Sequence, residues 1–140
     1  MNFLSIRAGD RIEVGAITGY RAWRYFWDDK PQLWSLVTDH IWIPGNLMEA
    51  PPDSGPRAGL YAFKRLSDLM AYNPLRAIKA LRVYGDGVII GKVRLWGVVW
   101  EHQRGYRAQH AEPTRFISSG AYCTSNAAMA LAKLREAFQV

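Results

Sequence analysis

In the segment from Lys92 to His102, positively charged residues and tryptophans recur at every second position or nearly so. This spacing is the clearest indication of a binding function in the sequence. In an extended strand, alternate residues share one face. One face would carry Lys92, Arg94, Trp96, Val98, Trp100 and His102, and the other Val93, Leu95, Gly97, Val99 and Glu101. The second set is typical of a side that packs on a core, whereas cations beside large rings are what single-stranded nucleic acid binding uses. The alternative is that the rings pack within the protein with the cations lying along them, and a bulge at Gly97 would change the face assignment.

A second group of cations and rings, Arg21, Trp23 and Arg24, overlaps the end of a tetrapeptide that occurs twice. Gly-Tyr-Arg-Ala is found at Gly19–Ala22 and at Gly105–Ala108, which predicts two similar hairpin starts. If the two hairpins are neighbours, one cationic and aromatic surface would contain Arg21, Trp23, Arg94, Trp96, Arg104 and Arg107. Arginine stacked on tryptophan inside the protein, without a ligand, is the alternative.

The acid–base candidates are Glu101, His102 and His110. Glu101 and His102 are adjacent and point to opposite faces of a strand, so they form no dyad by themselves. Across a hairpin His102 could approach His110, and Glu112 or Asp39 could then complete a metal or general-base site. Surface or hydrogen-bonded histidines are the alternative. The sequence has no phosphate-binding loop and no nucleophile or zinc motif, so we expect no cofactor or metal and favour a protein that is not an enzyme.

Size and composition predict a single folded domain over residues 1–140. The chain has a formal net charge of +6, which favours polyanionic partners such as nucleic acid or an acidic protein surface. One cysteine, Cys123, excludes an internal disulfide and a cysteine-based zinc site. No apolar run has the length of a membrane span, so we expect a cytoplasmic protein without a membrane partner.

The pattern along the chain predicts an α+β fold with a bent, mostly antiparallel, barrel-like sheet. A strand from Tyr20 to Trp27 returns over Gln32–Val37, and Val88–Gln103 is a long strand bent at its glycines and returning over Tyr106–His110. Short strands are expected at His40–Ile43 and Gly59–Lys64. A short helical segment capped by Ser67, a helical start at Asn73-Pro74 and an amphipathic C-terminal helix carrying Ala127, Leu131, Leu134 and Phe138 complete the fold.

Several short strings together resemble a group of small uncharacterised bacterial proteins, some of them carried by phage or other mobile elements. The strings are Gly19-Tyr-Arg-Ala-Trp-Arg24, Trp42-Ile-Pro-Gly45, Gly59-Leu-Tyr-Ala62, Leu95-Trp-Gly, Glu101-His and Gly105-Tyr-Arg-Ala108. The resemblance leads us to expect cysteines before the Gly-Leu-Tyr-Ala string, but Met48–Ala58 has none, so no metal role is transferred. The resemblance implies no established activity.

Three functional hypotheses follow, in order of preference. The first is a non-enzymatic nucleic-acid-binding accessory protein that uses Arg21, Trp23, Arg24, Lys92, Arg94, Trp96, Trp100, Arg104 and Arg107. The second is a protein-interaction module, such as a phage- or defence-associated regulator, with aromatic and arginine anchors. The third is a small enzyme or metal site at Glu101, His102 and His110.

Overall fold

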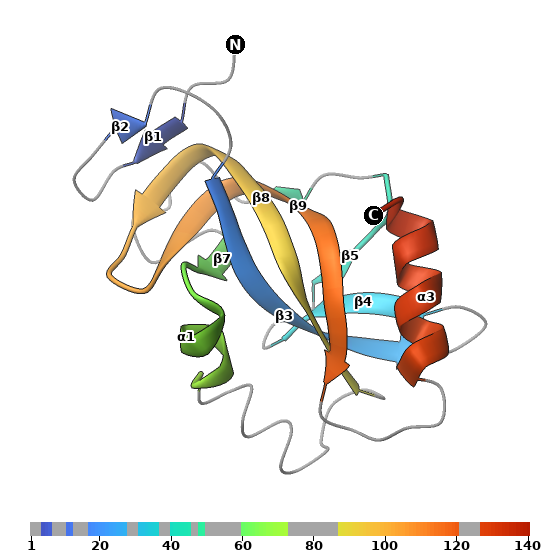
Figure 1. The fold of residues 1–140 in the computed structure, drawn as a ribbon. Helices are drawn as coiled ribbons and strands as arrows, with labels where there is room; N and C mark the ends of the chain where they lie inside the picture. Colours follow the sequence, from blue (N-terminus) through green and yellow to red (C-terminus); the bar gives the residue numbers. More distant parts are fainter. Residues whose placement is uncertain are drawn as a thin grey trace.

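The computed structural model describes residues 4–6, 11–12, 17–27, 31–36, 40–45, 48–49, 60–72, 87–120 and 127–140, and these residues form a large sheet and two helices (Figure 1). The strands are β1 (Leu4–Ile6), β2 (Arg11–Ile12), β3 (Ile17–Trp27), β4 (Pro31–Ser35), β5 (Ile41–Trp42), β6 (Met48–Glu49), β7 (Leu60–Phe63), β8 (Gly87–Glu101) and β9 (Gly105–Gly120). The helices are α1 (Leu66–Met70) and α3 (Ala127–Phe138). Apart from the parallel pair β1–β8, the pairings of the described strands are antiparallel, so the predicted α+β class with a mostly antiparallel sheet is confirmed.

Strand β3 has two neighbours besides β4. It pairs with β8 from Ile17↔Leu95 to Tyr25↔Gly87, and with β7 through the pair Tyr20↔Phe63. A closed barrel needs a continuous ladder all the way around, and one residue pair does not supply it. The barrel-like closure of the sheet is therefore not confirmed.

The hairpin of β8 and β9 is the longest unit of the sheet and bends where glycines were expected to bend it. The register shifts between Ile90 and Gly91 and again between Trp96 and Val99. Gly97, inside the second shift, has φ +82°, a conformation that residues with a side chain rarely adopt. A Cβ on Gly91 would collide with the carbonyl oxygen of Arg115, so this glycine permits a close approach of the two strands.

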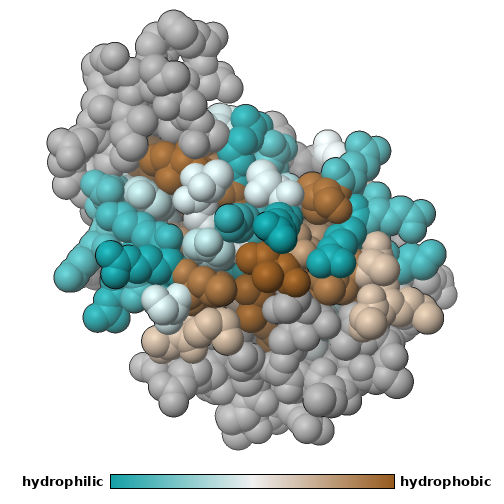
Figure 2. All heavy atoms as spheres, viewed as in Figure 1, coloured by the Kyte–Doolittle hydropathy of each residue, from teal (hydrophilic) through white to brown (hydrophobic). Residues whose placement is uncertain are grey.

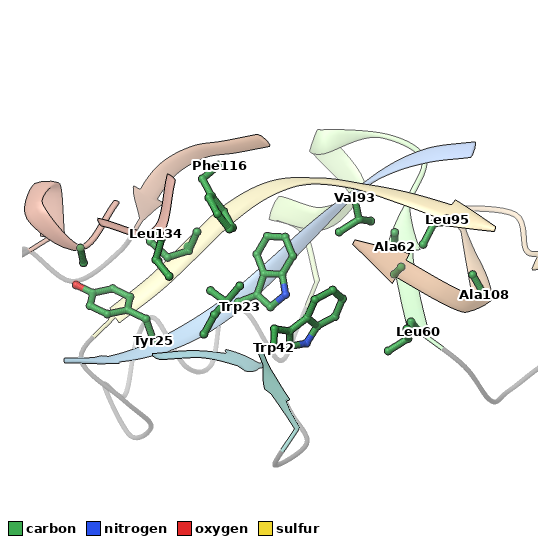
Figure 3. Packing of buried hydrophobic residues seen from close by; sticks show 14 of the residues in the cluster. Trp23, Tyr25, Trp42, Leu60, Ala62, Val93, Leu95, Ala108, Phe116 and Leu134 are labelled. Carbon is green, nitrogen blue, oxygen red and sulfur yellow. The ribbon is translucent and has the colours of Figure 1, made fainter. Parts of the chain in front are cut away.

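Two hydrophobic clusters lie on the two faces of the sheet, since neighbouring residues of a strand point in opposite directions. The larger cluster centres on Trp23, whose ring centroid is 5.5 Å from that of Trp42 and 5.6 Å from that of Phe116, both edge to face (Figure 3). Leu134 of α3 packs into this cluster, as the amphipathic pattern predicts. The smaller cluster contains Ala22, Leu36, Phe63, Leu69, Val88 and Ile90, and α1 contributes its Leu69.

The repeated tetrapeptides occupy different positions from those predicted. Gly105 does begin the second strand of a hairpin, but Gly19 lies inside β3 rather than at a turn. Their common feature is β7, because Tyr20 and Gly105 are both paired with Phe63. The repeat therefore marks two strands that flank β7, not two similar hairpins.

The local helix predictions have mixed outcomes. Helix α1 is present, but its N-cap is Arg65, with extended backbone and no side-chain capping bond, so the prediction of Ser67 as the cap is wrong. The predicted helical start at Asn73-Pro74 and Cys123 lie outside the described residues, as does most of the segment Met48–Ala58.

Candidate functional site

The outer face of β8 carries the alternation of cations and rings that the sequence predicts. Lys92, Arg94, Trp96 and Trp100 are half-buried, and they alternate with the fully buried Val93, Leu95 and Val99. The bulge at Gly97 leaves this alternation intact, because Leu95 before it and Val99 after it are both 0% exposed. The predicted alternation is confirmed for Lys92–Leu95 and for Val99, whereas Trp96 also packs against the larger hydrophobic cluster.

Strand β9 adds a second row to this face, because directly opposed residues of antiparallel strands point to the same side. We call the two rows and the turn residue Arg104 the outer stripe. Its opposed pairs are Lys92↔Arg115, Arg94↔Glu112, Trp96↔His110 and Trp100↔Arg107. Five Lys or Arg residues and one carboxylate give the outer stripe a net charge of +4 with histidine neutral. At about 3.3 Å per residue, the part of the outer stripe from Lys92 to Trp100 is about 26 Å long.

Three of the five cations of the outer stripe lie over aromatic rings of the protein itself. A long charged side chain gains from lying across a ring while its end stays in water. The pairs are Lys92 over Tyr20 at 5.2 Å, Arg94 over Trp96 at 4.4 Å and Arg107 over Tyr61 at 4.9 Å from the ring centroid. Trp96 is also stacked on His110, with 5.4 Å between centroids and 23° between planes.

Arg94 is neutralised by Glu112. Its Nε donates to Glu112 Oε1 at 2.8 Å, and its Nη2 lies 2.7 Å from the same oxygen. The other four cations of the stripe, Lys92, Arg104, Arg107 and Arg115, form no ion pair within the described residues.

Trp23 is not part of this surface, contrary to the prediction. Its side chain is 0% exposed, and the figure shows its ring enclosed between core residues (Figure 3). The reason is that Trp23 shares a face of β3 with Tyr25, and this face packs on the larger hydrophobic cluster.

Arg24 is buried as well, so its predicted place on the binding surface is wrong. It is 6% exposed, and its Nε donates to the carbonyl oxygen of Ser35 at 2.9 Å. Its guanidinium lies 5.6 Å from the ring of Trp34. Arginine stacked on tryptophan inside the protein, the alternative considered for this cluster, describes Arg24.

Arg21 fills the gap where β3 and β7 part. Beyond the pair Tyr20↔Phe63 no ladder joins these strands, and Arg21 Nη1 donates to the carbonyl oxygen of Tyr61 at 2.8 Å. Its guanidinium also lies 4.7 Å from the ring of Trp42. Burial, with a smaller contribution from the nearby charge of Arg107, lowers the pKa of Arg21 to about 10. Arg21 is half-buried and its guanidinium is held by Tyr61 and Trp42, so it has a structural role, while its role as a binding contact stays a prediction.

The acid–base candidates do not converge. Glu101 forms an ion pair with Lys64, whose Nζ lies 3.0 Å from Glu101 Oε2. His110 is opposite Trp96, six residues before His102, so about 20 Å of strand separates the two histidines. Their predicted approach across the hairpin is wrong. Within the described part of the chain, no group of three or more His, Cys, Asp or Glu side chains could hold a metal ion, and Asp39 lies outside that part.

Sequence reasoning missed Arg115 and Tyr61. The predicted returning strand ends at His110, whereas β9 continues to Gly120. Pro113 hides this continuation, because proline inside a strand pattern normally indicates its end; here it lies at a register shift. The sequence predicted Tyr61 only as a strand residue. In the structure its burial raises the pKa of the Tyr61 hydroxyl above the ordinary value of 10.0, which the sequence pattern does not show.

No protein-family model matches this chain, and neither the curated proteins nor the solved structures contain a significant match to it. The resemblance to small bacterial and phage-associated proteins therefore stays a prediction. Among the described residues, no helix is long and apolar enough to cross a membrane.

Proposed function

We propose that this protein is a non-enzymatic nucleic-acid-binding accessory protein and that the outer stripe contacts the phosphates. The observation that carries the proposal is a set of four cations, spread along one face of one hairpin, that form no ion pair with any described residue. Clustered positive charge of this kind attracts polyanions, and phosphate contacts release counterions. Cytoplasmic location and an association with phage or mobile elements belong to the same proposal.

The outer stripe is also arranged for a strand-like partner. The cations follow two adjacent β-strands in a band about 26 Å long, and a band tracks a chain of phosphates better than a compact patch does. On the face shown in Figure 2, hydrophilic residues lie across the middle and at both margins, with hydrophobic residues gathered between them.

The test is the salt dependence of oligonucleotide binding. Four phosphate contacts on a single strand predict a slope of log K against log salt of about −2.8, or about 50-fold weaker binding at ~200 mM than at ~50 mM salt. Arg104→Gln removes one exposed cation of the stripe and is expected to bring the slope to about −2.1. The matched control is Lys133→Gln, because Lys133 is 57% exposed on α3 and carries the same charge. No binding at low salt, or equal effects of the two variants, would refute the proposal.

A protein-interaction module is the second candidate, and one feature of the sheet favours it. Strand β5 lies at the end of the strand order of the described sheet, and its neighbourhood exposes Ile41 (40%) and Ile43 (49%). Edge strands with exposed apolar residues are frequent docking points for other chains. A protein partner that stays bound at high salt, together with no oligonucleotide binding at low salt, would favour this function over the first.

A further inference from the structure

Trp100 differs from the other tryptophans whose side chains the structure describes. Trp23 and Trp42 are buried in the core, Trp34 is packed against Phe26 and Arg24, and Trp96 contacts Arg94 and His110. Trp100 is half-buried, and within the described residues no ring stacks on its indole and no cation lies over it.

The cross-strand register places Trp100 beside cations that do not cover it. Trp100 is opposite Arg107, and Arg107 is in turn opposite Tyr61 on β7, so the three residues form one row across the sheet. The Arg107 guanidinium lies 4.9 Å from the ring of Tyr61, on the side of the row away from Trp100. Arg104, exposed in the turn, is the next cation along the hairpin.

We propose that Trp100 is a stacking platform for one base of a single-stranded nucleic acid, with Arg107 and Arg104 on the phosphates beside that base. A base must leave its duplex neighbours to expose a face to an indole, so the ligand is single-stranded at this position. This inference rests on the proposed function and adds a requirement for bases that phosphate contacts alone do not have.

The experiment compares two charge-matched ligands: a labelled thymine oligonucleotide and an abasic oligonucleotide of the same length. Both present the same phosphates, but only the first can stack. The protein is expected to bind the thymine strand about 5- to 150-fold more tightly, the range that one stacked base contributes. Trp100→Leu is expected to abolish this difference and to leave the affinity for the abasic strand unchanged. Trp100→Phe, which retains a ring, should keep most of it.

Failure of this inference differs from failure of the proposed function. If the unchanged protein binds both ligands equally and with the expected salt dependence, the outer stripe binds phosphates and the stacking platform is refuted. If Trp100→Leu retains the preference for the thymine strand, the base stacks on a ring other than Trp100, and the assignment of Trp100 as the stacking platform is wrong. If neither ligand binds at low salt, the proposed function and this inference both fail. Matching thermal unfolding curves for the variants show that they are folded.

Discussion

Glu112 is the one carboxylate of the outer stripe, and its removal should strengthen nucleic-acid binding. Glu112→Gln keeps the size and shape of the side chain but releases Arg94 from its ion pair. Arg94 would stay on the surface, because its guanidinium also lies 4.4 Å from the ring of Trp96. The variant therefore has five cations available to phosphates instead of four.

The expected magnitude follows from that count. Each phosphate contact on a single strand adds about 0.7 to the salt dependence, so the slope of log K against log salt should steepen from about −2.8 to about −3.5. The fold itself should tolerate the change. The paired side chains are 39% and 36% exposed, and a pair this accessible contributes about 0–1 kcal/mol to stability.

The assay is fluorescence anisotropy with a labelled single-stranded oligonucleotide at four or more salt concentrations. Glu136→Gln is the matched control, since it changes the net charge equally on α3, where the Glu136 side chain is 77% exposed. The control should leave the slope unchanged. If Glu112→Gln and Glu136→Gln change binding alike, the effect is one of total charge, and the reasoning about a localised stripe is wrong.

Three further predictions concern the fold beneath the stripe. Trp23→Ala should lower the free energy of unfolding by about 3–5 kcal/mol, measured by urea denaturation, because it empties the centre of the larger hydrophobic cluster; a loss below about 1 kcal/mol would contradict the burial of Trp23. Gly91→Ala should cost about 1–3 kcal/mol in the same assay, since the new methyl group meets the carbonyl oxygen of Arg115, and an unchanged midpoint would show that the strands do not approach so closely. Burial raises the pKa of Tyr61, so its contribution to stability is present below pH 10.0 and is lost as the pH rises through the folded-state value. As the pH rises above 10.0, the melting temperature of Tyr61→Phe should therefore fall less than that of the unchanged protein. Equal falls in both proteins would contradict a buried Tyr61 hydroxyl.

The period-two pattern was sufficient to predict the outer face of β8. Lys92 and Arg94 alternate with Val93 and Leu95, so polarity by itself distinguishes the two faces. The same reasoning failed on β3, where both faces are largely apolar. Ala22 lies in one hydrophobic cluster and Trp23 in the other, so no polarity difference indicates which ring is exposed. Burial of that strand on both faces is a tertiary property that the sequence pattern does not carry.

The predicted pairing of cations with rings was correct in kind but not in location. The sequence could not show that Arg21 closes the gap between β3 and β7. That gap arises only because β7 pairs with β3 at one position, Tyr20↔Phe63. The expected meeting of His102 and His110 failed because of register. A turn at residues 103–104 places His110 opposite Trp96, far along the hairpin from His102.

The most direct test of the central claim is to map where a bound single strand touches the protein. A photoreactive oligonucleotide would be cross-linked at low salt, and the attached peptides identified by mass spectrometry. We predict attachment within residues 92–115, on the outer stripe and including Trp100. Attachment confined to α3 or to the β4–β5 edge, with none on the β8–β9 hairpin, would contradict the account.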